Sequence, residues 1–327
     1  MKEQKQLTTE TRNEKSKHLD EMSALEIATL MNGEDQKVAL AVQKCLPQIA
    51  QAIESVAKAI KQGGRLLYIG AGTSGRLAVL DASECWPTFG VEHGVVVGTI
   101  AGGDRALRYS VENSEDSREG GVADLMALKP TKKDVVMGLS AGGGAPYILA
   151  ILEKAQQLGI KTIGYSSNTE AKLKAFSNIF INPVVGPEVL TGSSRLKSGT
   201  AQKMVLNQIT TGAFTLVGKV YENLMIDVRV MNEKLRDRAM RIICDITGVE
   251  RDVAERCLAE SQKFLKEPTK GVPLAVVMSG KNLPARAAAA LLKQHDGFVK
   301  KALNAQTPVK KKINNALLIN SVRHLSK

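Results

Sequence analysis

Histidine and cysteine are scarce in this sequence. The chain has 327 residues but only four of each, and the cysteines are far apart and show no paired spacing (Cys45, Cys85, Cys244 and Cys257). Scattered thiols of this kind favour reduced cysteines over disulfides, and they do not provide the spacing of a metal site. We therefore expect no metal, no disulfide and a cytoplasmic location.

Aromatic residues and long apolar runs are also few. Aromatics make up 4% of the chain, too few for base-stacking platforms, although the net charge is +12. The longest apolar runs are too short to span a bilayer, and the polar N-terminus does not resemble a signal peptide or an anchor. We expect neither a nucleic acid nor a membrane as partner, and the positive charge suits anionic small ligands.

Alternating strands and helices dominate the chain from Arg65 onward. Five short apolar segments with helical segments between them predict strands at about 65–70, 94–100, 134–140, 161–166 and 179–185. Repeated βα units predict an α/β fold, in which a parallel five-stranded sheet has helices on both faces. Ligands of such sheets bind at the carboxyl ends of the strands.

The rest of the chain is predicted to be helical. Ser23 and Glu26 form a capping box that begins a short helix, which we expect to end near Gly33, and a longer helical region follows over 34–62. The predicted organisation is an N-terminal helical arm (1–62), a sheet domain (63–236), a small C-terminal helical module (237–303) and a basic tail (304–327).

A glycine-rich segment follows the first predicted strand. Gly70-Ala71-Gly72-Thr73-Ser74-Gly75 is expected to form a turn, with a helix from Arg76, and such a turn suits a phosphate. Its spacing also fits a dinucleotide fingerprint, but the next strand ends in Ala101-Gly102-Gly103 and lacks the required acidic residue. The hydroxyls of Thr73 and Ser74 favour a phosphomonoester; a purely structural turn is the alternative.

A second polar stretch covers 186–203. Within ten positions at the start of a predicted helix it contains hydroxyls and cations that together suggest an anion clamp (Thr191, Ser193, Ser194, Arg195, Lys197 and Thr200). The alternative reading, a polar cap on a long helix, does not require so many hydroxyls together with both charges.

Two glutamates are candidates for acid–base chemistry. Glu84 is expected to follow a short helix that keeps it near the phosphate, and Glu115 follows the second strand–helix unit. Two carboxylates in one crevice are able to divide the work of acid and base. Glu115 also has the alternative reading of a solvated helix start, whereas Glu84, beside Cys85 and Trp86, is unusual for open surface.

Taken together, these motifs resemble those of the N-acetylmuramic acid 6-phosphate etherases. The resemblance rests on Gly70–Leu77, Asp81-Ala-Ser-Glu-Cys85 and the 186–203 stretch, and it covers roughly residues 7 to 303. It implies a sugar isomerase (SIS) domain with a flavodoxin-like sheet, related to the glucokinase regulatory protein, and a C-terminal module similar to ubiquitin-associated domains. It also implies a homodimer with sites near the subunit interface.

The resemblance further implies an activity. These enzymes cleave the D-lactyl ether of the sugar 6-phosphate and give N-acetylglucosamine 6-phosphate and D-lactate, without metal or cofactor. Glu84 then corresponds to the acid/base that serves lactate departure, and Glu115 to a second glutamate, plausible as the base at C2. The phosphate-binding set is expected to comprise loop and clamp residues (Gly72, Thr73, Ser74, Ser140, Gly142, Ser193, Ser194, Arg195 and Lys197).

Two departures from the family pattern leave other functions open. After the third strand, the family usually places Ser, Arg and Thr where this chain has Gly142, Gly144 and Ala145, and Trp86 replaces a usual proline beside the proposed acid, where it would narrow the pocket. The loss of hydroxyls favours a second hypothesis, a weakly active sugar-phosphate sensor that regulates a partner. A sugar-phosphate isomerase ranks third, and an NAD-dependent dehydrogenase last.

Overall fold

A computed structural model describes residues 8–306 and contains one parallel sheet. Its strands occur in the order β2-β1-β3-β4-β5, which confirms the predicted five-stranded parallel sheet. Their bounds agree with the apolar segments (β1 Leu66–Gly70, β2 Val96–Ile100, β3 Val135–Leu139, β4 Lys161–Tyr165 and β5 Ile179–Ile181). All residues of β1 and β3 are buried, as expected for central strands covered on both faces.

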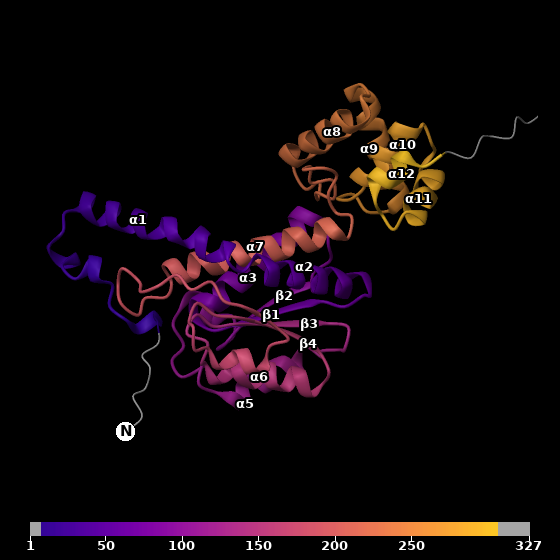
Figure 1. Cartoon of the computed structure of the whole chain (residues 1–327). Coiled ribbons are helices and arrows are strands. Elements are labelled where there is room, and N and C mark those ends of the chain that lie inside the picture. Colours follow the sequence, from indigo (N-terminus) through magenta and orange to yellow (C-terminus); the bar gives the residue numbers. More distant parts are fainter. Residues whose placement is uncertain (1–7, 307–327) are drawn as a thin grey trace, which may run out of the picture.

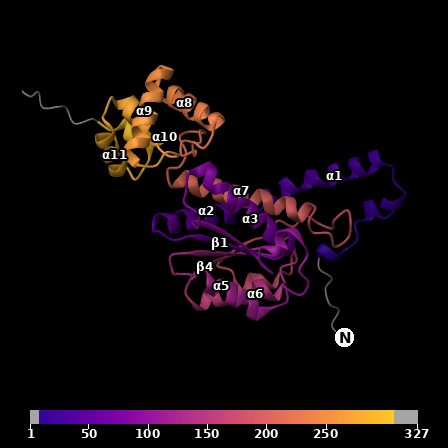
Figure 2. The ribbon, with the colours of Figure 1, turned by 180° about the vertical axis from the view of Figure 1, so that it is seen from behind.

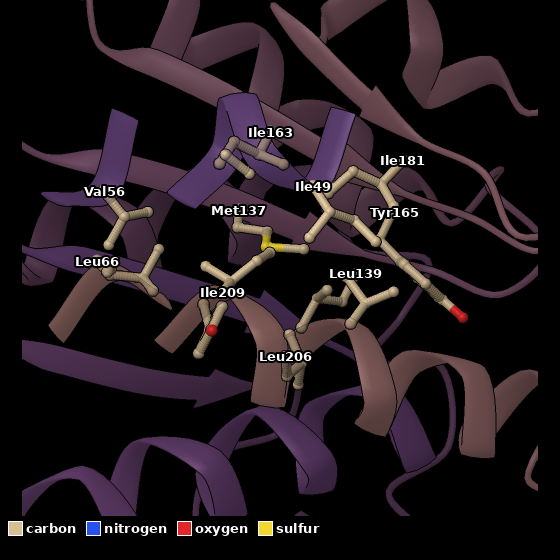
Figure 3. Packing of buried hydrophobic residues seen from close by; sticks show 14 of the residues in the cluster. Ile49, Val56, Leu66, Met137, Leu139, Ile163, Tyr165, Ile181, Leu206 and Ile209 are labelled. Atoms are coloured by element: carbon tan, nitrogen blue, oxygen red, sulfur yellow. The ribbon is translucent and has the colours of Figure 1, made fainter. Parts of the chain in front are cut away.

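Helices cover both faces of the sheet (Figures 1 and 2). One face packs against α2 (Leu46–Lys61), α3 (Gly72–Phe89) and α7 (Lys197–Leu216). The other packs against α5 (Arg118–Ala127) and α6 (Pro146–Gln157). Figure 3 shows the first core, in which apolar residues of α2 and α7 meet those of the strands (among them Ile49, Val56, Leu66, Met137, Ile163, Leu206 and Ile209).

Helix α1 (Ala24–Gln43) is longer than the sequence suggested. Both hydrogen bonds of the Ser23–Glu26 capping box form, which confirms the predicted start. The predicted end near Gly33 was wrong, because the helix continues for three more turns to Gln43. A side chain at Gly33 would contact nothing, so this glycine only lowers helix propensity by about 1 kcal/mol, which packing of Val38 and Val42 outweighs.

The segment before α1 lies against loops of the sheet domain. Three short 3₁₀ turns follow one another (η1 Thr8–Glu10, η2 Glu14–Ser16 and η3 Leu19–Glu21). The Thr8 N–H donates to Asn168 Oδ1 at 3.0 Å, and Asn13 Nδ2 donates to the Pro187 carbonyl at 3.3 Å. The start of the described chain is therefore fixed beside the carboxyl ends of the strands.

A separate helical module follows the sheet domain (Figure 1). It comprises α8 (Glu233–Thr247), α9 (Arg251–Leu265), α10 (Val272–Lys281), α11 (Ala285–Gln294) and α12 (Val299–Asn304). Its hydrophobic core begins at Ile226 and ends at Ala302, so the predicted boundary at 236 falls inside α8. The similarity to ubiquitin-associated domains stays a prediction, and most of the predicted basic tail (307–327) lies outside the described residues. None of the helices within 8–306 is long and apolar enough to cross a membrane.

Candidate functional site

The strand order creates a topological switch point between β1 and β3. The helix that follows β1, α3, covers one face of the sheet, and the helix that follows β3, α6, covers the other. Crevices at such points are the usual ligand sites of open α/β sheets. Gly75 allows the start of α3 to pack tightly here, because a Cβ at this position would lie 2.5 Å from Ile100 Cγ1.

A cavity of about 180 Å³ lies at this switch point. It unites residues from three stretches that the sequence singled out separately: Gly72, Thr73 and Ser74 at the start of α3, Ser140 and Gly142 after β3, and Ser194 before α7; Glu115 and Gln202 complete the polar lining. Of the predicted turn, residues 72–75 form the first turn of α3, so the expected helix start at Arg76 was wrong.

Neutral donors dominate this smaller cavity. None of the residues that line it is a lysine, arginine or histidine. The N–H of Gly75 is the first to bond within α3, to the Ala71 carbonyl at 3.2 Å, so the N–H groups of the three preceding residues are not used by the helix. Those groups and the helix dipole favour an anion, and the hydroxyls of Thr73 and Ser74 add two donors.

The loop after β3 offers backbone rather than hydroxyls to the same cavity. The Ser140 hydroxyl accepts a hydrogen bond from the Gly143 N–H at 3.1 Å, which shapes the loop. Helix α6 begins at Pro146, and no side chain caps its N-terminus at Ala145. A side chain at Gly142 would meet no atom within 4 Å, so the missing hydroxyl leaves open space at the cavity wall.

A second cavity, of about 450 Å³, adjoins the first. It is lined by Arg76, by Ala106 of the short helix α4 (Arg105–Arg108) and by the acidic loop 110–116, and it shares Ala71, Gly72 and Glu115 with the smaller cavity. The backbone of Glu115 is anchored, because its carbonyl accepts the Tyr147 N–H at 3.0 Å. Glu115 therefore lies at the boundary of the two cavities, where a ligand that fills both would pass. Within residues 8–306, no group of three or more His, Cys, Asp or Glu side chains is arranged to hold a metal ion.

Comparison with known proteins decides the family. A model of the glucokinase regulatory protein N-terminal SIS domain matches residues 48–156, and a model of the C-terminal lid domain of that protein matches 222–270. The chain is 52% identical over 297 residues to the N-acetylmuramic acid 6-phosphate etherase of Serratia proteamaculans, covering 91% of this chain and 98% of that protein. The chain belongs to the N-acetylmuramic acid 6-phosphate etherase family.

A second curated relative supports this membership, and one solved structure is given for comparison. The etherase of Actinobacillus pleuropneumoniae is 49% identical over 91% of this chain and 95% of that protein. Among solved structures, a phosphoheptose isomerase from Francisella tularensis matches with a TM-score of 0.46 and 19% identity, over 59% of this chain and all of that one. The resemblance to etherases inferred from the sequence is thereby confirmed over nearly the whole length of the relatives.

Glu84, the glutamate that was expected to act as the acid, lies away from both cavities. Glu84 does not follow a short helix, as expected, but belongs to the last turns of the continuous helix α3. At about 1.5 Å per residue it is about 18 Å along the helix axis from Gly72. Its side chain is exposed, while Asp81 and Cys85 on the same helix are buried, and it lines neither cavity.

The stretch before α7 contributes only part of the predicted clamp. Ser194 lines the smaller cavity, whereas Ser193 and Arg195 flank it without lining it. Lys197 does not direct its ammonium to the cavity, because this group is buried and donates to Glu34 Oε2 of α1 at 2.6 Å. The hydrogen-bonding capacity at the start of α7 is used internally as well, since the buried Glu188 carboxylate accepts the N–H groups of Lys197 and Ser198 at 3.0 and 2.9 Å.

Sequence reasoning also missed the residue that joins α7 to the cavity. Gln202 Nε2 donates to the Ser74 carbonyl at 3.0 Å and lines the smaller cavity. Its position at the end of the 186–203 stretch was the only available signal. Trp86, which was expected to narrow the pocket, is absent from the lining of both cavities and instead stacks on His93, with 5.0 Å between the ring centroids.

Three buried polar side chains, Asp81, Tyr68 and Cys85, lie near the proposed acid, under α3. Burial raises the pKa of Asp81, although the charge of Lys203 and hydrogen bonds from Thr210 and Tyr68 oppose the effect. Burial likewise raises the pKa of the Tyr68 hydroxyl and of the Cys85 thiol. The Tyr68 hydroxyl and the Cys85 thiol therefore favour their neutral forms. All three groups belong to the interior of the domain, so we assign them no contact with substrate.

Proposed function

We propose that this protein cleaves the D-lactyl ether of N-acetylmuramic acid 6-phosphate and releases N-acetylglucosamine 6-phosphate and D-lactate. The observation that carries the proposal is the pair of adjoining cavities at the switch point, with Glu115 at their boundary. Membership of the etherase family supports the choice of reaction. We propose that the reaction uses neither a metal nor another cofactor.

The smaller cavity is the proposed phosphate site. The free N–H groups at the start of α3 and the hydroxyls of Thr73, Ser74 and Ser194 provide donors that need no cation, and the backbone around Ser140 and Gly142 adds to them. A dianion held in this way benefits from the helix dipole, which acts most strongly at the first turn. The sugar then extends from the smaller cavity past Glu115 into the larger one.

The proposed chemistry is an elimination followed by addition of water. In the open-chain aldehyde the carbonyl at C1 acidifies the proton at C2, which the Glu115 carboxylate removes. The C3–O bond breaks as Glu84, supplied by the second subunit of the homodimer proposed below because it lines neither cavity of its own chain, protonates the departing ether oxygen, so D-lactate leaves and an unsaturated aldehyde remains. Water then adds at C3 and a proton returns to C2, which completes N-acetylglucosamine 6-phosphate. Each proton transfer by a positioned side chain contributes about 10²–10⁴-fold.

We also propose that the active form is a homodimer, in which the site is completed near the subunit interface. The first half of α1 projects away from the sheet domain (Figures 1 and 2), and Leu25 and Leu40 are 77% and 61% exposed. Leu80, one turn before Glu84 on α3, is 42% exposed. Contact with a second subunit would cover these leucines, and a partner beside α3 would enclose Glu84. The free cysteines suit a cytoplasmic location.

One assay tests the proposed reaction. The pure protein is incubated with N-acetylmuramic acid 6-phosphate, and D-lactate is measured over time. We expect release by the wild type and none by Glu84→Ala, which should retain most of its substrate affinity. Wild-type-like turnover in Glu84→Ala would remove that residue from the mechanism. Tight binding by the wild type without any D-lactate would overturn the reaction and support the sensor hypothesis instead.

The dimer has its own test. Analytical ultracentrifugation of the wild type should give twice the mass of the chain, and Leu25→Glu should shift the equilibrium toward the monomer. Leu216→Glu, a substitution of another exposed leucine away from α1, is the matched control and should not change the mass. A monomeric wild type would contradict the proposal.

A further inference from the structure

Arg76 has a fixed orientation at the edge of the larger cavity. It belongs to the second turn of α3, and its guanidinium is held by two backbone carbonyls of α4. Nε donates to the Leu107 carbonyl at 3.0 Å, and Nη2 donates to the Ala106 carbonyl at 2.7 Å. Among residues 8–306, no group accepts a hydrogen bond from Nη1, so one edge of this guanidinium is left for a ligand.

The electrostatic setting of Arg76 is unusual. It is the only lysine or arginine among the residues that line either cavity. The other charged residues of the larger cavity are all acidic: Glu112, Glu115 and Asp116. A second anion on the substrate would be repelled by this wall except beside Arg76, so the charge pattern selects one position for it.

We propose that Arg76 binds the carboxylate of the lactyl group and thereby selects the lactyl ether over other sugar 6-phosphates. This inference rests on the proposed function, which supplies a substrate with a phosphate on C6 and a carboxylate on the ether at C3. The smaller cavity takes the phosphate with neutral donors, and the larger cavity offers Arg76 to the carboxylate. Glu115, shared by the two, then lies between these anchors, beside C2 and C3.

Arginine suits this role better than a mobile cation would. A guanidinium presents planar, directed N–H groups to a carboxylate, and the two carbonyl contacts from Ala106 and Leu107 already orient its plane. The ordering of the side chain is therefore complete before the substrate arrives, which reduces the entropy lost on binding. With the phosphate held in the smaller cavity and the carboxylate held by Arg76, the ether oxygen would stay in one place while the C3–O bond breaks.

Binding of reduced ligands tests the inference without any turnover. The alditol of N-acetylmuramic acid 6-phosphate lacks the aldehyde, so its C2 proton is not acidified and the ether stays intact. Calorimetry compares this ligand with its lactamide, in which an amide replaces the carboxylate, and with N-acetylglucosaminitol 6-phosphate, which has no lactyl group. We expect the wild type to bind the carboxylate ligand about 10–100-fold more tightly than the lactamide.

Two variants localise this preference. Arg76→Gln retains donors for the carbonyls of α4 but loses the charge. Its preference for the carboxylate ligand over the lactamide should fall below about threefold. Its affinity for N-acetylglucosaminitol 6-phosphate should stay within about threefold of the wild-type value. Arg108→Gln removes the same charge from the exposed side of α4 and should keep the full preference.

Three results would overturn the inference. Equal affinity of the wild type for the carboxylate ligand and the lactamide would contradict the inference without any variant. The test therefore still works if Arg76→Gln does not fold. An unchanged preference in Arg76→Gln assigns the carboxylate to another residue. An equal loss of affinity for all three ligands assigns Arg76 to the phosphate. Failure of the proposed function shows separately, as the absence of D-lactate from the wild type.

Discussion

The guanidinium carbon of Arg229 lies 5.2 Å from the centroid of the Trp86 ring. Arg229 is only 4% exposed, and its Nη2 donates to the Gly90 carbonyl at 3.2 Å and to Glu92 Oε1 at 3.1 Å. Nη1 donates to Thr269 Oγ1 at 3.2 Å. One side chain thus joins the end of α3, the loop before β2 and the loop before α10, which links the sheet domain to the helical module.

Removal of this link should destabilise the protein. Arg229→Met loses a cation–π contact and three hydrogen bonds, of which the one to the Gly90 carbonyl is buried, so we expect the free energy of unfolding to fall by about 2–3 kcal/mol. The control is Arg256→Met, which breaks an ion pair with Asp252 in which both side chains are more than 60% exposed, so its stability should stay close to that of the wild type. Urea denaturation at pH 7 measures both, and equal losses would show that the Arg229 contacts add nothing.

The buried pair of Glu34 and Lys197 predicts a pH dependence. Burial raises the pKa of Glu34, but hydrogen bonds and charges from Lys197 and Lys37 outweigh it and lower the pKa to about 2, from an ordinary 4.5. Because the folded state holds the proton more weakly than the unfolded state, the ionised pair stabilises the fold above about pH 4.5. This contribution is lost as the pH falls from about 4.5 to about 2.

Glu34→Gln isolates this contribution. At pH 7 the substitution leaves the Lys197 ammonium buried without its carboxylate, which should cost about 3 kcal/mol. The stability difference from the wild type should be constant between pH 5.5 and 7 and should shrink below about pH 4.5. Thermal unfolding across this range provides the measurement, with Glu54→Gln on the exposed side of α2 as control. A difference that persists unchanged to pH 3 would contradict the assignment to Glu34.

The same pair shows where sequence reasoning reached its limit. The strands were predicted within a few residues, because uninterrupted apolar runs such as Leu66–Ile69 are decisive for a buried parallel strand. By contrast, Glu34 and Lys197 are 163 positions apart, and no local pattern indicates that one neutralises the other. Lys197 therefore looked like a free cation in a polar stretch.

Helix boundaries failed for a related reason. The glycines of 70–75 were interpreted as a turn because glycine has low helix propensity. In the structure α3 already begins at Gly72, and Gly75 is the residue at which the helix packs closely on Ile100. That shift of four residues, together with the continuation of α3 to Phe89, moves Glu84 from the expected crevice to the surface. The residues that line the smaller cavity followed from local motifs, but the position of Glu84 depends on tertiary packing.

Isotope exchange should separate the roles of the two glutamates. If Glu115 is the base at C2, Glu115→Gln should lose both D-lactate release and exchange of the C2 proton with D₂O, each by about 10²–10⁴-fold. Glu84→Gln should lose D-lactate release but keep C2 exchange, because the proton is removed and returned while the ether stays intact. Proton NMR of the C2 signal follows exchange, and Glu119→Gln, which lines neither cavity, is the control. The opposite pattern would exchange the two roles.

Two neighbouring glycines in the loop after β3 provide a matched pair of substitutions. At Gly142 an added side chain meets no atom within 4 Å and borders the smaller cavity, so Gly142→Ser supplies a hydroxyl to the proposed phosphate site without strain. A further hydrogen bond to a charged group should lower the KM for the sugar phosphate about 10-fold. Gly143 has a φ of +71°, and a Cβ there would lie 2.3 Å from Ala171 Cβ.

Gly143→Ser should therefore lower the melting temperature and raise the KM, because the loop must shift to relieve the contact. Initial rates of D-lactate release and thermal unfolding, measured side by side, distinguish the two variants. A lower KM in Gly142→Ser would show that the phosphate reaches the wall of the smaller cavity at this loop. An unchanged KM would place the phosphate against α3 alone, where the first-turn N–H groups and the hydroxyls of Thr73 and Ser74 would hold it without the β3 loop.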